Sequence, residues 1–201
     1  MDIKEHWEKV YKTKTPDQVS WTQKKPQESL DLIHSVTIEK SDAVIDIGGG
    51  DSNLVDFLLE EGYSNITVLD ISAEAIKRAK HRLGMLANKV TWIVSDIVDF
   101  KPTQQYKIWH DRAAFHFLTN PKAISSYCSL LENFANRNVI LGVFSTDGPL
   151  KCSGIEISQY DKESLINTIP KSFSLLESFT KDHLTPFETT QNFLFCSFQK
   201  K

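Results

Sequence analysis

Three glycines, Gly48, Gly49 and Gly50, follow an apolar run that ends in Asp46 and Ile47. Because glycine has no side chain, such a turn lets a ligand lie against the backbone and adopts conformations closed to other residues. A buried carboxylate such as Asp46 needs a polar or cationic partner. An amino group of a ligand would meet this need, whereas a pyrophosphate would be repelled.

Two further aspartates end the next two apolar runs. Asp70, followed by Ile71, is suited to accept two hydrogen bonds from a ribose diol. Asp96 is placed to accept from the exocyclic amine of an adenine, with the backbone amide of Ile97 available to a ring nitrogen. Asp70 lies 24 residues after Asp46, and Asp96 another 26 residues on. Each aspartate alone is as often a turn former, but together they predict an adenosine site.

The sequence of the glycine turn indicates which class of adenosine-containing ligand would bind there. A nicotinamide dinucleotide site favours G-x-G-x-x-G, but the sixth position counted from Gly48 is Asn53. An adenosine joined to an amino acid, as in S-adenosylmethionine, fits both this turn and the acid at Asp46. A nicotinamide-dependent oxidoreductase is the alternative from another class, and a non-catalytic cofactor-binding subunit is the third.

The elements that must position these residues alternate along the chain. Strand-like runs lie at 43–47, 66–70, 90–94, 107–111 and 139–144, with amphipathic helical patterns between them. This alternation predicts parallel crossovers in a doubly wound α/β sheet, where ligands bind beyond the carboxyl ends of the strands. Two last strands, at 173–179 and 192–198, are separated by about a dozen residues without a helical pattern, which predicts antiparallel pairing.

Composition fits one domain over residues 1–201, with 40% hydrophobic residues and a net charge of −3. These values give no reason to expect nucleic acid or a membrane as partner. The three cysteines are widely spaced and predict neither a disulfide framework nor a metal site, so a cytoplasmic protein is expected. Residues 1–40 are predicted to form a helical cap. Trp21, in a polar stretch, is expected either in the core or against a bound ligand.

With these residues the sequence resembles the class I S-adenosylmethionine-dependent methyltransferases, whose first motif is an acid followed by h-G-x-G-x-G. The segment from Asp46 to Ser52 is similar, with Ser52 where the third glycine usually stands. The resemblance implies a Rossmann-like fold whose seven strands follow the order 3-2-1-4-5-7-6, with strand 7 antiparallel. It also implies that Asp70 binds the ribose and that Asp96 and Ile97 bind the adenine.

The segment 109–118 resembles the stretch that, in this family, lines the floor between cofactor and substrate. Asp111 is the candidate for a cofactor or substrate contact, and His110 or His116 for a general base. Arg112 is the candidate for holding a carboxylate of the substrate or cofactor. Two alternatives remain open: an internal ion pair between Asp111 and Arg112, and a core histidine at position 116.

The resemblance implies methyl transfer from S-adenosylmethionine to an oxygen, nitrogen or sulfur nucleophile of a small-molecule acceptor, without a metal. A protein acceptor, such as a lysine, is the nearest variant. The N-terminal cap is expected to close over the cofactor as a lid. The sequence makes no prediction about oligomeric state.

Overall fold

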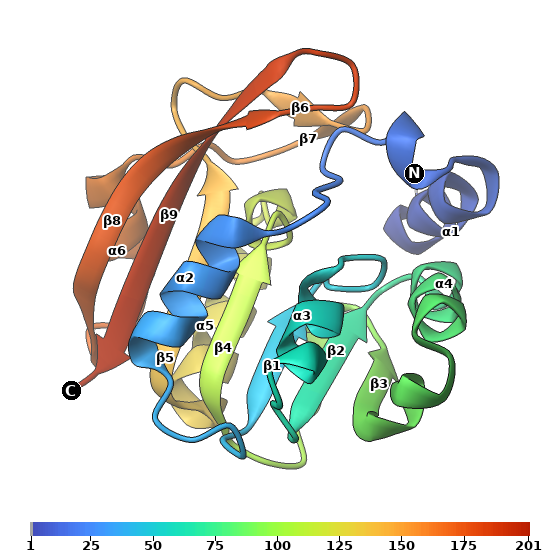
Figure 1. The fold of residues 1–201 in the computed structure, drawn as a ribbon. Helices are drawn as coiled ribbons and strands as arrows, with labels where there is room; N and C mark the ends of the chain where they lie inside the picture. Colours follow the sequence, from blue (N-terminus) through green and yellow to red (C-terminus); the bar gives the residue numbers. More distant parts are fainter. Residues whose placement is uncertain (1) are drawn as a thin grey trace.

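The computed structural model describes residues 2–201 and contains a seven-stranded sheet with helices on both faces (Figure 1). The strands are β1 (Val44–Ile47), β2 (Ile66–Asp70), β3 (Val90–Val94), β4 (Tyr106–Arg112), β5 (Ala135–Phe144), β8 (Phe173–Leu184) and β9 (Thr190–Lys200). Their order is β3-β2-β1-β4-β5-β9-β8, with β9 antiparallel to both neighbours and the other pairs parallel. The predicted order is confirmed, since β8 and β9 are the sixth and seventh strands of this sheet.

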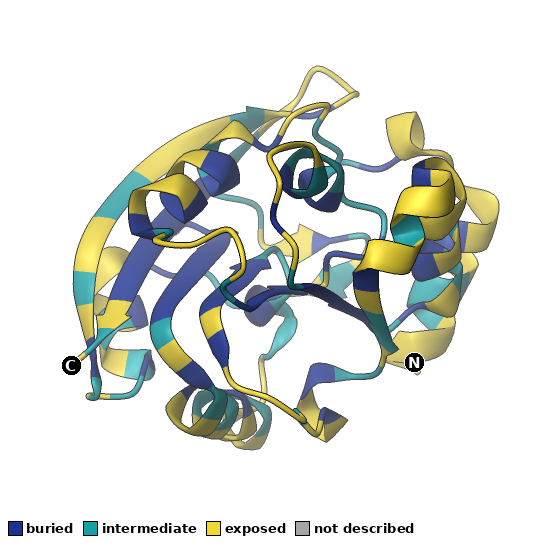
Figure 2. Cartoon of the chain, turned by 60° about the horizontal axis from the view of Figure 1, so that its bottom comes forward, coloured by how far each residue is buried: buried dark blue, intermediate teal, exposed yellow. Residues whose placement is uncertain are grey.

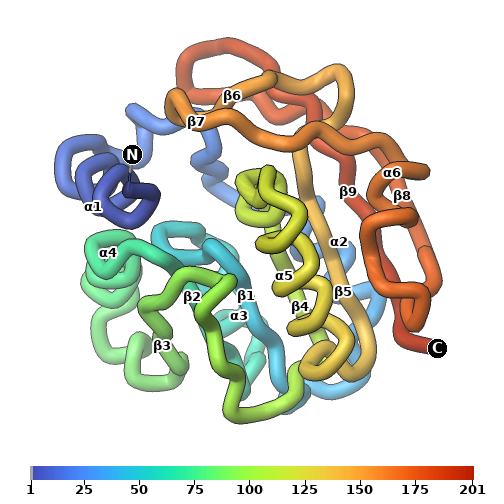
Figure 3. The backbone as a smooth tube through the Cα atoms, turned by 180° about the vertical axis from the view of Figure 1, so that it is seen from behind, coloured from blue at the N-terminus to red at the C-terminus, as the bar shows by residue number. Residues whose placement is uncertain are grey.

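Two hydrophobic cores lie on opposite faces of the sheet. The helices are α1 (Ile3–Thr13), α2 (Gln27–Val36), α3 (Leu54–Glu60), α4 (Ala73–Leu83), α5 (Pro121–Phe134) and α6 (Lys162–Thr168). Leu30 of α2 and Leu58 of α3 belong to one core, and Tyr127 of α5 and Leu165 of α6 to the other. Figure 3, seen from behind, shows α5 and α6 in front of the sheet. The central strands are buried, whereas the edge strand β8 is largely exposed (Figure 2).

Short polar motifs set the helix ends. The side chain of Ser72 caps α4 by accepting from the amide of Ala75, and Asn120 caps α5 immediately before Pro121. Gly62 has a φ of 88° just after α3, a conformation that favours glycine. These local signals fix where the helices begin and end, and hence where the loops at the strand ends lie.

The expected boundaries of the last strands are wrong. β8 and β9 both extend toward their shared turn, so five residues, 185–189, connect them instead of about a dozen. The exposed edge position of β8 explains the difference, because an edge strand does not need an apolar run. The long loop after β5 also contains an unexpected hairpin, β6 (Lys151–Cys152) and β7 (Ile155–Glu156), which turns through Ser153 and Gly154 at positive φ.

Helix α1 lies apart from the sheet and packs near the start of α4 (Figure 1). The Glu8 carboxylate accepts from the amides of Ala73 and Glu74 at 2.8 and 3.1 Å. A carboxylate is favoured at this position because the first amides of a helix are unpaired and carry partial positive charge. Within residues 2–201, no helix has the length and apolar character needed to cross a membrane.

Candidate active site

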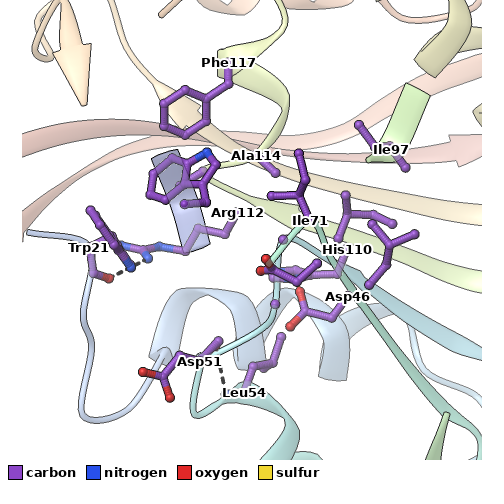
Figure 4. Close-up of a pocket in the computed structure, with 18 of the residues that line it drawn as sticks. Trp21, Asp46, Asp51, Leu54, Ile71, Ile97, His110, Arg112, Ala114 and Phe117 are labelled. Carbon is purple, nitrogen blue, oxygen red and sulfur yellow. Dashed lines mark hydrogen bonds and ion pairs between the residues drawn. The ribbon is translucent and has the colours of Figure 1, made fainter. Parts of the chain in front are cut away.

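A cavity of about 300 Å³ lies at the carboxyl ends of β1, β2 and β4 (Figure 4). Its size is at the lower end of the range for small-molecule sites, roughly 300 to 1,000 Å³. The predicted site residues that line it are Trp21, Asp46, Gly48, Gly49, Asp70, Ile71, Asp96, Ile97, His110 and Arg112. The fold therefore brings together side chains from four strand ends and the N-terminal segment.

The glycine turn is shaped by close approach of its neighbours. Gly48 has a φ of 68°, and a Cβ added to Gly49 would lie 2.1 Å from Oδ2 of Asp46. Gly50 does not line the cavity; its amide donates to Oδ2 of Asp70 at 3.0 Å, so it supports the site through that carboxylate. Ser52 adopts no positive φ, which explains why serine is tolerated at the usual third glycine position.

Asp46 and His110 face each other across β1 and β4. Nδ1 of His110 lies 2.6 Å from Oδ1 of Asp46, and Nε2 lies 2.9 Å from the hydroxyl of Ser29 on α2. Both ring nitrogens are engaged, so His110 is a partner of Asp46 and not a free base. Oδ2 of Asp46 is buried without a hydrogen-bond partner among the described residues. Such an acceptor is costly unless a ligand donates to it.

The two other aspartates lie at neighbouring strand ends. Oδ1 of Asp70 accepts from the amide of Ser72 at 2.8 Å, and burial raises the pKa of this carboxyl to about 6. Asp96 begins a short 3-10 helix, Ile97–Asp99, whose Val98 amide donates to Oδ1 at 3.0 Å. Asp96 and Asp70 line the same cavity as Gly48 and Gly49 of the glycine turn.

The structure corrects the prediction for Asp111. Its carboxylate does not line the cavity and accepts instead from the amides of Ala114 and Phe115, both at 3.0 Å, and from the hydroxyl of Tyr127 at 2.8 Å. Successive residues of a strand point to opposite faces, so Asp111 must face α5 when its neighbour His110 faces α2. The same alternation rules out the ion pair between Asp111 and Arg112.

The prediction of His116 as a base is also wrong. Its ring is buried outside the cavity and stacks on Phe144, with 4.4 Å between centroids. Nδ1 accepts from the amide of Phe144 at 3.2 Å. Burial and the nearby charge of Arg112 lower the pKa of His116 to about 3, so the imidazole is neutral at physiological pH. The core alternative is the correct one here.

Arg112 reaches the cavity from the end of β4. Its Nη1 donates to the carbonyl of Trp21 at 3.0 Å (Figure 4). Its guanidinium carbon lies 4.7 Å from the centroid of the Phe193 ring. Burial lowers the pKa of Arg112 to about 10, which still leaves it protonated at neutral pH. Within residues 2–201, no group of three or more His, Cys, Asp or Glu side chains is arranged to hold a metal ion.

Aromatic side chains that the sequence did not single out complete the wall. Trp7 lies 5.4 Å from Trp21 and 5.2 Å from Phe117, measured between ring centroids, and Tyr11 lines the same cavity. Trp21 therefore both packs on other aromatic rings and lines the site. The amphipathic pattern of residues 3–12 was the available signal, because it places Trp7 and Tyr11 on one helical face. Cys152 also lines the cavity, and burial raises its thiol pKa to about 11.

Comparison with known proteins agrees with this geometry. Residues 44–133 match the methyltransferase domain family. The malonyl-[acyl-carrier protein] O-methyltransferase 2 of Ilyobacter polytropus is 30% identical over 139 residues, which are 67% of this chain and 50% of that protein. The chain thus spans about half the length, or less, of the curated relatives it matches.

Solved structures share the fold over nearly the whole chain. A S-adenosylmethionine-dependent methyltransferase from Anabaena variabilis has a TM-score of 0.74 at 15% identity, over 100% of this chain and 96% of that one. The magnesium protoporphyrin IX methyltransferase from Synechocystis, solved with bound S-adenosylmethionine, has a TM-score of 0.68 at 16% identity, over 98% and 90%. Residues 44–133 therefore match the methyltransferase domain family, and the whole chain has the fold of S-adenosylmethionine-dependent methyltransferases.

Proposed function

We propose that this chain binds S-adenosylmethionine in the cavity and transfers its methyl group to a nucleophile of a small-molecule acceptor. The observation that carries the proposal is the convergence of Asp46, Asp70 and Asp96, from three strand ends, on one cavity beside a glycine turn. The unpaired buried oxygen of Asp46 fits a ligand that brings an ammonium group. The methyltransferase names of the relatives give independent support.

Each of these residues would hold a different part of the cofactor. Asp46 would accept from the amino group, and His110, fixed at both ring nitrogens, keeps that carboxylate in place. Asp70 would accept from the ribose hydroxyls. Asp96 and the amide of Ile97 would bind the adenine. The bound cofactor supplies a methyl group already activated on a sulfonium.

The protein then contributes mainly by aligning the reactants and by excluding water from the site. Aligning an acceptor with an electrophile can supply on the order of 7 to 11 kcal/mol of a reaction barrier. Trp7, Trp21 and Phe117 form the apolar wall that would exclude water. The helix α2 packs in the core, so we propose that the part of the predicted cap before it, residues 2–26, acts as a lid that carries two of these rings. A lidded cavity of this size favours a small acceptor over a folded protein, and the O-methyltransferase relative makes an oxygen nucleophile the first class to test.

Isothermal titration calorimetry with S-adenosylhomocysteine, the demethylated cofactor, tests the proposal. The wild-type protein is expected to bind it with micromolar affinity. Asp70→Asn should weaken binding by about 1 to 3 kcal/mol, because the ribose hydroxyls lose a charged acceptor. Asp99→Asn, an exposed aspartate two residues beyond Ile97, is the control and should bind as the wild type does. Absence of binding to the wild-type protein would contradict the proposed function.

A further inference from the structure

Only some of the hydrogen-bond donors of the Arg112 guanidinium have a partner. Nη1 donates to the Trp21 carbonyl, but Nε and Nη2 are buried and have no hydrogen-bond partner among the described residues. A buried cation that lacks partners for its donors is unfavourable, since burial removes the water that would otherwise bind them. Arg112 lines the cavity, so its side chain borders the space open to a ligand.

The two unpaired nitrogens define the shape of the missing partner. Nε and Nη2 lie on one edge of the planar guanidinium, and their N–H bonds run nearly parallel. This edge matches the two oxygens of a carboxylate in a bidentate pair, which is stronger than a single neutral hydrogen bond. A neutral amide or ester offers only one acceptor oxygen in that plane.

No protein carboxylate fills this role. Glu28 is near enough to favour the charged form of Arg112, but it pairs with Lys181 at 3.5 Å. Asp46 is hydrogen-bonded to His110. Among residues 2–201, neither of these carboxylates nor any other makes an ion pair with Arg112. The counter-ion must therefore come from outside the chain.

Arg112 is also held rigidly. The bond to Trp21 and the face of the Phe193 ring fix its guanidinium. The next residue, Ala113, has a φ of 67°, which is unusual for a residue with a side chain, and its amide donates to the carbonyl of Gly142 at 2.8 Å. Strained backbone of this kind persists where the surroundings determine it, often at functional sites.

We propose that Arg112 binds a carboxylate group of the methyl acceptor through Nε and Nη2. The inference rests on the proposed function and names the chemical class of its acceptor. Arg112 extends toward Trp21 and away from Ile97, which lies on the side expected for adenine (Figure 4). The thiol of Cys152 lines the same cavity and is neutral, so it supplies no negative charge to pair with Arg112.

Nuclear magnetic resonance of protein labelled with ¹⁵N-arginine tests this pairing directly. The protein is saturated with S-adenosylhomocysteine and titrated with malonate or benzoate, and in parallel with malonamide or benzamide. The Nε–H resonance of Arg112 is assigned from its loss in Arg112→Lys. Its chemical shift should change when a carboxylate is added and remain constant when the matching amide is added. The affinity for carboxylates should fall about 10- to 100-fold in Arg112→Lys, because lysine keeps the charge but lacks the two parallel N–H donors. Arg137→Lys, on β5, is the matched control.

The outcomes separate the two proposals. If neither carboxylate moves the resonance in protein that binds S-adenosylhomocysteine, the acceptor assignment is wrong while the proposed function stands. If S-adenosylhomocysteine itself moves the resonance and Arg112→Lys loses affinity for it, Arg112 holds the carboxylate of the cofactor, and the assignment is again overturned. If carboxylates bind at Arg112 but S-adenosylhomocysteine does not bind at all, the proposed function fails and the anion site remains.

Discussion

The ionisable residues of β1 and β4 are divided between the two faces of the sheet. Asp46 and His110 face α2, where Ser29 completes their hydrogen bonds. Asp111 faces α5 and is bound by Tyr127. Asp46 borders the cavity and keeps one oxygen without a hydrogen-bond partner. Both oxygens of Asp111, in contrast, accept hydrogen bonds from groups of the protein. Residues adjacent in sequence therefore have different chemistry: one group is available to a ligand and the other holds the loop after β4.

His116 should make the stability of the protein sensitive to acid. Its folded-state pKa of about 3 lies below the unfolded value of about 6.5. Below pH 6.5 His116 binds a proton in the unfolded chain but not in the native protein. Its contribution to the free energy of unfolding therefore falls as the pH falls. The loss is about 2 kcal/mol between pH 7 and 5.

Urea unfolding of wild-type protein and His116→Asn at several pH values measures this contribution. The asparagine can still accept from the Phe144 amide but does not titrate. The difference in unfolding free energy between the two proteins should shrink by about 2 kcal/mol from pH 7 to pH 5. The raised pKa values of Asp70 and Asp111 affect both proteins equally and cancel. Parallel pH profiles would show that His116 is not buried in its neutral form.

At the scale of elements, the segment between α1 and α2 is held over the cavity by side chains of the body. Five of its backbone carbonyls accept hydrogen bonds from side chains elsewhere in the chain. The pairs are Arg78 with Lys14, His183 with Ser20, Arg112 with Trp21, and Asn53 with both Gln23 and Lys24. Backbone carbonyls are acceptors that any residue provides, so such a closure needs no particular side chains on the segment itself. The long β8–β9 hairpin contributes His183 and, through Gln191, a bond to the hydroxyl of Ser20.

Removing one of these bonds should loosen the segment without disturbing the sheet. The side-chain amide of Asn53 donates to the carbonyls of Gln23 and Lys24 at 3.0 and 3.3 Å. Asn53→Ala should therefore destabilise the closed segment by about 1 kcal/mol and speed hydrogen exchange of residues 14–26 several-fold. Hydrogen-exchange mass spectrometry measures the rates, with the exposed Asn167→Ala on α6 as control. Equal exchange in the two variants would count against a lid closed by these bonds.

At the scale of the whole molecule, the cavity lies where the order of the sheet reverses. β1 pairs with β2 on one side and with β4 on the other, so the loops after these strands diverge and leave a crevice. The N-terminal segment and the β6–β7 hairpin approach this crevice from the other side, joined by a contact of 3.2 Å between His6 and Ser153. A ligand in the crevice would therefore touch both halves of the sheet and the covering segment.

Ligand binding should accordingly stabilise the entire fold. At a concentration 100 times the dissociation constant, S-adenosylhomocysteine should add about 2.7 kcal/mol to the free energy of unfolding. For a chain of this length the midpoint of thermal unfolding should rise by about 5 to 10 °C. Differential scanning calorimetry measures the shift, and NADH at the same concentration is the comparison. A shift with NADH and none with S-adenosylhomocysteine would favour the oxidoreductase alternative.

The alternation of strands and helices could be predicted because the central strands carry apolar runs, whereas the order of the strands was implied by the resemblance to the methyltransferase family. The glycine turn, Asp70 and Asp96 could also be assigned to one edge, because the residue after a parallel strand always lies at that edge. The ends of β8 were missed because an exposed edge strand has no apolar pattern to mark it. The role of Trp7 was missed because a tryptophan on an amphipathic helix is equally suited to a core.

The sequence by itself determined the fold, the edge of the sheet that carries the site and the acids that would hold an adenosine, since these depend on local pattern and on one topological rule. Only the tertiary structure decided which polar residues of β4 face the cavity and which have all their hydrogen-bond partners inside the protein. The reason is that hydrogen-bond saturation depends on partners far away in the chain. Tyr127 and two amides satisfy Asp111, whereas Arg112 keeps two donors without a partner.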